Sequence, residues 1–473
     1  MDRSSVHLRA GEFVRFSAST AEREFIRNAQ STETDQRGFV FAQSVDGDMV
    51  LAASLTTPPG EYTVNGVATD KNGDVREAVI TAVVSPLLTV PINATKPPVI
   101  LLNGLQPPNL LLDSCPISEA IDTFGRLEPV LRTYGAPAVY FFDNCRENRN
   151  GAIEDLGAQL GRVLNSIRYD NGQPVPNVDL IGHSMGGLII RSYLAGLRTD
   201  GSLSPPPNPR VRKTVQIATP NFGSYLSSDL GAQTRSMMMG SDFIWKLATW
   251  NARGDDLRGV DAIAIIGNLG YQRTLGSGPP DGGGDGVVST TSASLGFARE
   301  SARTRILPYC HSDYGPLHQF VVDCNGSGIA KAAETEAIIR SFLSDTSEWR
   351  TIGVTPTQDI WLSRYGGLLF TSANANNEVM SDLGRVTFGA FPLNTGGITE
   401  SRLFYNEFVS GTESFAMSSR SLGNMNCGPF AQTPGRGNAV RCKTSPAIWS
   451  VGPLVPGLAR MVRAGGTINI TGT

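Results

Sequence analysis

The stretch VDLIGHSMGGLIIRSYL, residues 178–194, holds a serine between two glycines in the pattern Gly-x-Ser-x-Gly, where the serine is Ser184. An apolar, strand-like run precedes the pattern and a helix-like run follows it. A strained strand-to-helix turn raises a serine hydroxyl clear of its backbone, and the flanking Gly182 and Gly186 avoid side-chain collisions there. At this glycine content the pattern can arise by chance, so the elements on either side of it must show whether the serine is a nucleophile. That context predicts Ser184 as a nucleophile rather than an ordinary turn serine.

A nucleophilic serine needs a base, and the sequence offers four histidines. His183 adjoins Ser184 and is expected to point away from it, while His7 lies in an N-terminal β region. His311 directly follows the strand-like run RILPYC, and functional residues of parallel sheets gather at the carboxyl ends of strands. We predict His311 as the base, with His318 as the alternative.

The base needs an orienting carboxylate, which is expected between the serine and the histidine in the chain. The glycine-rich segment PPDGGGDGVVS offers Asp281 and Asp285. Asp285 is preferred because Gly286 provides a turn and the two following valines can pack behind it. Asp281, or a loop-capping role for either carboxylate, is the alternative.

Two backbone N–H groups are candidates for binding an oxyanion. Met185 follows the serine at the start of the expected helix, where the helix dipole assists. Leu105 follows an early strand in the run VILLNGLQPP and is the second candidate. The alternative is that Asn103 and Gly104 only form the turn that ends this strand.

Strand-like and helix-like segments alternate from Pro97 onward, which predicts an α/β fold with a mostly parallel sheet covered on both faces. Strands are predicted in PPVILLNG, APAVYFFD, NVDLIG, VRKTVQIAT, VDAIAIIG and RTRILPY, and helices in ISEAIDTFGRLEPVLRTYG, at residues 153–167, after Ser184 and in IAKAAETEAIIRSFLSD.

β structure is expected on both sides of this region. Near the N-terminus, Asp46-Gly47 and Asn72-Gly73 separate β-favouring runs and predict hairpins. The phrase PPGEYTVNGVATDKNGDVREAVITAVV resembles the last strands of bacterial immunoglobulin-like modules, which implies a β-sandwich. The predicted domains are an immunoglobulin-like β domain at 1–92, an α/β catalytic domain at 97–346 with a cap at about 220–258, and a β-rich C-terminal domain at 347–473.

The six cysteines fall into three local pairs, and short loops cost least to close. We expect three disulfides and an oxidising compartment, with six buried free thiols as the alternative. The first residues lack an apolar signal core, so the chain is either cytosolic or shortened by processing; the cysteines favour a secreted, periplasmic or cell-surface protein. The predicted pairs are Cys115–Cys145, Cys310–Cys324 and Cys427–Cys442.

The bulk composition excludes several classes of function. The net charge of -3 gives no indication of nucleic-acid binding, and no run of 18 or more apolar residues predicts a transmembrane segment. The absence of a Cys-x-x-Cys motif and the four histidines argue against a zinc cluster. No metal and no cofactor are expected.

The order serine, acid, histidine is that of α/β-hydrolases, and the motifs LIGHSMGGLIIRSYL, QIATPNFGS and GDGVVS resemble those of bacterial lipases. The same motifs are similar to those of GPI inositol-deacylase-like and lecithin:cholesterol acyltransferase-like hydrolases. The likeness spans roughly residues 97–345 and departs from these families at Asn103-Gly104-Leu105, where such lipases usually have His-Gly, and in the long loop after His311. The resemblance implies an α/β-hydrolase fold and ester hydrolysis through an acyl-enzyme.

The expected substrate is a lipophilic carboxylic ester. The segment between the strands VRKTVQIAT and VDAIAIIG could line an acyl-chain pocket, or it could simply pack on the core. An acyltransferase that uses the same residues, or an adhesion protein that contacts a surface or polymer through its β domains, are the alternative functions. The apolar residues of this segment are Met237, Met238, Met239, Phe243, Trp245 and Trp250.

Overall fold

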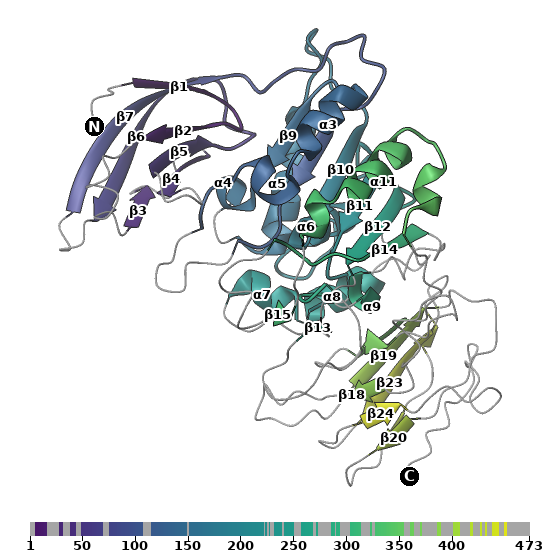
Figure 1. The fold of residues 1–473 in the computed structure, drawn as a ribbon. Helices are drawn as coiled ribbons and strands as arrows, with labels where there is room; N and C mark the ends of the chain where they lie inside the picture. The colour runs from purple at the N-terminus through teal and green to yellow at the C-terminus, as the bar shows by residue number, and fades with distance from the viewer. Residues whose placement is uncertain are drawn as a thin grey trace.

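The centre of the molecule is a six-stranded sheet in which every neighbouring pair of strands is parallel (Figure 1). Its order is β14-β12-β11-β10-β8-β9. The strands are short and mostly buried on both faces, as strands between two layers of helices must be. Their bounds are β8 (Val99–Leu102), β9 (Val139–Phe142), β10 (Val178–His183), β11 (Val211–Ile217), β12 (Asp261–Gly267) and β14 (Thr304–Leu307).

The structure is a computed structural model, and its C-terminal part is described only within strands. The described residues are 5–16, 28–31, 38–43, 49–69, 75–106, 115–148, 151–221, 223–224, 227, 231–238, 241–249, 257–267, 271–272, 285–288, 290–293, 303–313, 322–323, 327–353, 360–363, 369–370, 386–388, 401–406, 417–419, 426–427, 431–432, 438–443 and 449–451.

Two apolar clusters cover the two faces of the sheet, because successive strand residues point to opposite sides. On one face, Ile100 and Leu102 pack with helices α5 (Ile153–Ser166) and α6 (Met185–Ala195). On the other face, Val99 and Leu101 pack with α3 (Leu127–Tyr134) and α11 (Ala333–Leu343). The predicted helical stripe from Ile153 to Ile167 is buried along its length.

The segment ISEAIDTFGRLEPVLRTYG, predicted as one helix, forms two. Helix α2 (Ala120–Phe124) ends at Gly125, and α3 begins at Leu127. Gly125 has a φ of +57°, which lies outside the helical region and which glycine adopts without steric cost. The hydrophobic periodicity runs through this break, and periodicity alone therefore could not reveal it.

The N-terminal β region consists of two sheets, with the orders β1-β7-β6-β3 and β2-β5-β4. Apolar residues of both sheets share one core cluster, which gives the predicted β-sandwich. The strands on either side of the two predicted hairpin turns pair antiparallel, although the turn residues lie outside the described part of the chain. The immunoglobulin-like resemblance stays a prediction. The strands are β1 (Ser5–Arg9), β2 (Phe13–Phe16), β3 (Asn28–Ser31), β4 (Phe39–Gln43), β5 (Met49–Ala53), β6 (Gly60–Thr69) and β7 (Val75–Ser85).

The C-terminal part is β-rich, as predicted, and its described strand pairs are all antiparallel. The strands are β16 (Ile360–Ser363), β17 (Leu369–Phe370), β18 (Val386–Phe388), β19 (Ser401–Asn406), β20 (Met417–Ser419), β21 (Asn426–Cys427), β22 (Ala431–Gln432), β23 (Asn438–Lys443) and β24 (Trp449–Val451).

Small elements lie beside one end of the central sheet (Figure 1). Helices α7 (Ala232–Ser236) and α8 (Asp242–Thr249) follow β11, where a cap was predicted. They lie near α9 (Thr290–Ala293) and the pair β13 (Tyr271–Gln272) and β15 (Val322–Asp323). Across the described residues, no helix is both long and apolar enough to cross a membrane.

Candidate active site

Ser184 occupies a strained turn between β10 and α6. Its φ of 54° and ψ of -126° lie outside the regions that a serine normally adopts. Its N–H donates to the carbonyl oxygen of Ile217 at 2.8 Å, which ties the turn to the neighbouring strand. A Cβ atom on Gly182 would lie 2.5 Å from the nitrogen of Gly187, and one on Gly186 would lie 2.5 Å from the oxygen of Leu102. Both glycines are therefore required for the reason that the sequence suggested.

The side chains of Ser184, His311 and Asp285 form one hydrogen-bonded chain. His311 Nε2 lies 2.9 Å from Ser184 Oγ, and His311 Nδ1 lies 2.7 Å from Asp285 Oδ2. Each residue follows a different strand of the sheet: Ser184 follows β10, Asp285 comes after β12, and His311 comes after β14. The exposed fractions are 8% for Ser184, 7% for His311 and 0% for Asp285, so the chain of contacts is shielded but its serine end remains accessible.

Backbone groups hold Asp285 in its orientation toward the imidazole. Its Oδ1 accepts the N–H groups of Val287 at 2.9 Å and Val288 at 2.7 Å, which leaves Oδ2 for His311. The N–H of His311 donates to the backbone oxygen of Asp285 at 2.9 Å. The turn depends on Gly286, whose φ is +93°. The preference for Asp285 over Asp281 rested on this turn, and Asp281 lies outside the described residues.

His183 lies in the site, although it was not predicted to take part in the chemistry. Its Nε2 donates to the backbone oxygen of His311 at 2.9 Å, and its exposed fraction is 6%. Burial, together with the nearby His311, lowers the pKa of His183 to about 3, so the ring is neutral at pH 7. It does not contact Ser184 as a base would, but it holds the backbone of His311. Nothing in the sequence indicates this contact, because His183 and His311 are 128 residues apart in the chain.

The predicted oxyanion donors lie close to the serine. Met185 is the first residue of α6. Gly104 approaches Ser184 so closely that a Cβ atom on it would lie 2.8 Å from the Cβ of the serine, and Leu105 is the next residue. Asn103, where the lipases usually have histidine, is buried and donates from Nδ2 to Ser118 Oγ at 3.1 Å. This contact supports the loop, and the oxyanion roles of Met185 and Leu105 stay predictions.

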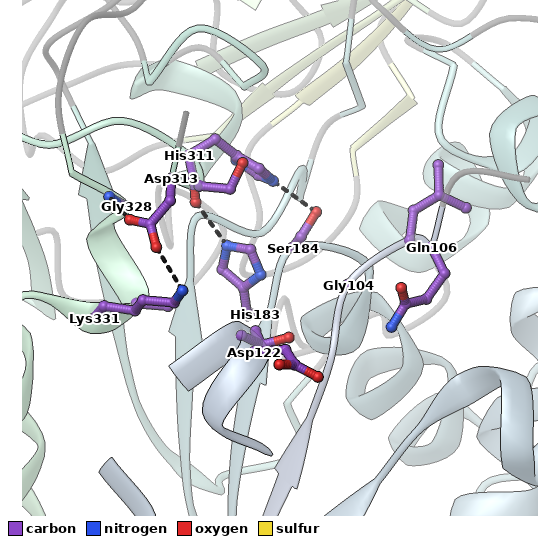
Figure 2. Close-up of a pocket in the computed structure, with 13 residues that line it drawn as sticks. Gly104, Gln106, Asp122, His183, Ser184, His311, Asp313, Gly328 and Lys331 are labelled. Carbon is purple, nitrogen blue, oxygen red and sulfur yellow. Dashed lines mark hydrogen bonds and ion pairs between the residues drawn. The ribbon is translucent and has the colours of Figure 1, made fainter. Parts of the chain in front are cut away.

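A pocket of about 240 Å³ opens over Ser184 (Figure 2). Lys331, which precedes α11, pairs with Asp313, and Asp313 Oδ1 accepts the N–H of Gly328 at 2.8 Å. The described wall of the pocket is therefore largely polar. It is lined by Gly104, Leu105, Gln106, Asp122, Thr123, His183, Ser184, His311, Ser312, Asp313, Gly328, Ala330 and Lys331.

Two apolar residues of the predicted cap pack on the core. Met237 and Phe243 are both buried and belong to the cluster that covers the α5 and α6 face of the sheet. This is the alternative that the sequence left open, rather than the lining of an acyl-chain pocket. Met239 and Trp250 lie outside the described residues, as does His318, the alternative base. His7, the remaining histidine, is exposed on β1.

The cysteines agree with local pairing as far as the structure describes them. Cys115 and Cys145 form a disulfide with a Cα–Cα distance of 5.4 Å. Cys310 is disulfide-bonded, and its predicted partner Cys324 lies outside the described residues. Cys427 and Cys442 are register partners on the neighbouring strands β21 and β23. This register is compatible with a disulfide, and their pairing stays a prediction. Among the described residues, no group of three or more His, Cys, Asp or Glu side chains could hold a metal ion.

Comparison with known proteins gives one family match. A family model described as "Alpha/beta hydrolase of unknown function (DUF915)" matches residues 137–236, which include β9, β10, α6 and β11. The six-stranded parallel sheet with helices on both faces is an α/β-hydrolase fold, and the match supports a hydrolase. The comparison with curated proteins gives no significant match.

Solved structures that resemble the chain do so at low identity. Phospholipase PlaB from Legionella pneumophila, in complex with thio-NAD, is 13% identical, with 73% of this chain and 79% of that chain covered and a TM-score of 0.36. A gene product from Listeria innocua is 13% identical, with 53% of this chain and 95% of that chain covered and a TM-score of 0.30. A lipase-esterase related protein from Clostridium acetobutylicum is 14% identical, with 38% and 78% covered and a TM-score of 0.21.

Proposed function

We propose that the protein is a serine hydrolase that cleaves carboxylic esters through an acyl-enzyme. The observation that carries this proposal is the double contact of His311, with Nε2 at 2.9 Å from Ser184 Oγ and Nδ1 at 2.7 Å from Asp285 Oδ2. A buried carboxylate on Nδ1 favours the tautomer in which Nδ1 carries the proton. Nε2 is then free to accept the proton of the serine hydroxyl, which is the requirement for a general base.

The reaction proceeds in two halves. In the first, Ser184 Oγ attacks the ester carbonyl as His311 Nε2 takes its proton, and the N–H groups of Met185 and Leu105 bind the oxyanion. The tetrahedral intermediate collapses when His311 returns the proton to the departing alcohol. In the second half, His311 deprotonates a water molecule that attacks the acyl-enzyme, and the acid is released with Ser184 restored.

We further propose a lipophilic ester, on the basis of the sequence resemblance to bacterial lipases, and a site of action outside the cytoplasm. Gln106, Asp122 and Lys331 give the described wall of the pocket a polar character that suits the carbonyl and alcohol portion of an ester. The disulfide Cys115–Cys145 supports export, because such bonds persist in oxidising compartments.

The test combines substrate profiling with active-site labelling. The wild-type protein is assayed against p-nitrophenyl esters of increasing chain length, and a fluorophosphonate probe is located by peptide mass spectrometry. We expect hydrolysis and a label on Ser184, both abolished in Ser184→Ala with the circular dichroism spectrum unchanged. Label that persists in this variant would place the nucleophile elsewhere, and a preference for the shortest ester would contradict a lipophilic substrate.

A further inference from the structure

The loop that carries the proposed oxyanion donor Leu105 is held from behind by Asn144. This residue begins helix α4 (Asn144–Asn148), directly after β9, and is buried. Its Nδ2 donates to the backbone oxygen of Gly104. Its N–H in turn donates to Asn103 Oδ1 at 3.0 Å. Asn144 therefore bonds to two successive residues of the loop beside the nucleophile.

The bond to Gly104 acts on one particular peptide unit. The carbonyl of Gly104 and the N–H of Leu105 belong to the same planar peptide, in which the two groups point in opposite directions. A donor that fixes the carbonyl thereby fixes the direction of the N–H. A hydrogen bond to the carbonyl also polarises the peptide and strengthens the N–H as a donor. The amide of Asn144 thus controls the aim of the group proposed to bind the oxyanion.

Helix α4 is itself anchored by buried polar contacts. Asp143 Oδ1 accepts the N–H of Arg146 at 2.9 Å at the start of the helix, and Asp143 Oδ2 accepts the N–H of Ser118 at 2.8 Å. Arg146 Nε lies 3.2 Å from Glu147 Oε1, and both side chains are almost fully buried. Arg146 also donates to the backbone oxygen of Phe141 in β9. A buried pair of this kind is stable only when its remaining hydrogen bonds are satisfied.

The N-terminal β region supplies several of those remaining bonds. The N–H of Leu55 donates to Glu147 Oε1 at 3.0 Å and to Oε2 at 3.2 Å. The backbone oxygen of Gly11 accepts a bond from Arg146 at 2.6 Å. Strands β2 and β5 of this region also pack on the disulfide Cys115–Cys145, which adjoins Asn144 in the chain. Figure 1 shows α4 on the side of the hydrolase region that faces the N-terminal sheets.

We propose that Asn144 is a positioning residue for the oxyanion-binding peptide Gly104–Leu105 and that the N-terminal β region holds it in place through Arg146 and Glu147. The inference rests on the proposed function, because it assigns a role within that site. The N-terminal β region is then a structural part of the enzyme and sets its turnover, in addition to any contact that it makes with a surface.

The first test compares Asn144→Ala and Asn144→Asp with Asn148→Ala, a control in the same short helix. Asn144→Asp keeps the size of the side chain and removes the donor. We expect both Asn144 variants to lose about tenfold to a hundredfold in kcat toward p-nitrophenyl butyrate, with KM almost unchanged. This loss is smaller than the roughly hundredfold to thousandfold loss seen when an oxyanion donor itself is removed, because the N–H of Leu105 is still present. The inhibition constant of a trifluoromethyl ketone, which forms an oxyanion on the serine, should rise by the same factor as kcat falls.

Two results separate positioning of the oxyanion donor from a general structural role. The pH profile of kcat/KM should keep its midpoint, because the contact between His311 and Asp285 is untouched. The control Asn148→Ala should match the wild type. Unchanged kcat in both Asn144 variants, an equal loss in the control, or unaltered inhibition by the ketone would overturn the inference.

The second test asks whether the N-terminal β region acts through Asn144. Glu147→Gln keeps the shape of the side chain and weakens its pairing with Arg146, and it is measured below the temperature at which its near-ultraviolet circular dichroism changes. If both residues act on one peptide, Glu147→Gln lowers kcat and the double variant with Asn144→Ala loses no more than Asn144→Ala alone. Losses that multiply, or full activity of Glu147→Gln, would overturn the link.

Measurements on the wild type distinguish failure of the proposed ester hydrolysis from failure of the inference about Asn144. A wild-type protein that neither hydrolyses an ester nor reacts with fluorophosphonate at Ser184 contradicts the proposed function, and the inference falls with it. A wild type that does both, with Asn144 variants equal to it, contradicts the inference alone.

Discussion

The side chain of His183 is bonded to the backbone of His311, with Nε2 at 2.9 Å from the carbonyl oxygen, and the two rings lie 4.9 Å apart between centroids. The residue before the proposed nucleophile therefore holds the residue that provides the proposed base. The ring of His183 stays neutral, because a charged ring would be buried and would lie close to His311.

His183 should make the folded state sensitive to acid. The folded pKa of about 3 lies below 6.5, the ordinary pKa of a histidine exposed to solvent. Between these values the unfolded chain binds a proton that the folded chain does not, so stability falls as the pH falls through this window. Denaturant titrations from pH 7 to pH 4 should show that His183→Gln removes up to about 1.4 kcal/mol per pH unit of this dependence. Parallel curves for the variant and the wild type would contradict the prediction.

His311 should be essential and His318 dispensable. We expect His311→Ala to lower kcat/KM by about three orders of magnitude or more, because the serine then has no base. His318→Ala should change it far less. Steady-state kinetics on one p-nitrophenyl ester measure both variants, and the reverse ranking would move the base along the loop.

Asp285→Asn should disturb the tautomer of the base while preserving the turn. The asparagine oxygen can still accept the N–H groups of Val287 and Val288, which places the amide nitrogen toward His311. Nδ1 must then act as acceptor, and Nε2 carries the proton that it should receive. We expect kcat to fall by about 10⁴ with little loss of thermal stability. Asp313→Asn, which alters another carboxylate of the same pocket, is the control, and an equal loss there would argue against the assignment.

The disulfides should differ in their effect on activity. Cys310 adjoins His311, and its backbone is tied to Ser327 and Ile329 by hydrogen bonds of 3.0 and 2.8 Å. Losing its disulfide should free the loop of the base, so a Cys310→Ser and Cys324→Ser double variant should lose activity at temperatures well below its melting transition. Removing both Cys427 and Cys442 should leave ester hydrolysis almost unchanged.

Peptide mapping without reduction provides the control for these variants, because it measures the pairing directly. Each predicted disulfide closes a loop worth about 3 kcal/mol in the chain-entropy model. Free thiols at Cys324, Cys427 or Cys442 in protein from an oxidising compartment would contradict the pairing.

The central fold was predictable because its strands are buried on both faces. Most residues of runs such as VDLIGH and DAIAIIG are apolar, and the helices between them show a clear period, so the alternation predicts the parallel sheet. The break at Gly125 was not predictable, since one glycine in a periodic segment is compatible with a continuous helix.

The sequence predicted a serine, an acid and a histidine after strands of one sheet, and in the structure these three side chains contact one another, while their catalytic roles stay predictions. Ser184, Asp285 and His311 each follow a strand of one sheet, which is enough to bring them together. The contacts of His183 and Asn144 were missed because each joins a side chain to a backbone carbonyl, and no sequence pattern indicates such a contact. Residues 143–147 are polar apart from Cys145, yet they are buried, and contacts with Leu55 and Gly11 of the N-terminal region account for part of this burial.

The residues of the site are far apart in the chain, so the site can form only after the last of them has been synthesised. Ser184 and His311 are 127 residues apart, and β14, which precedes His311, is the last strand of the central sheet to be synthesised. A nascent chain that ends after β12 contains Ser184, the proposed nucleophile, but lacks His311, the proposed base. Reactivity toward a fluorophosphonate during synthesis should therefore appear late and abruptly, and its appearance would report that the central sheet is complete.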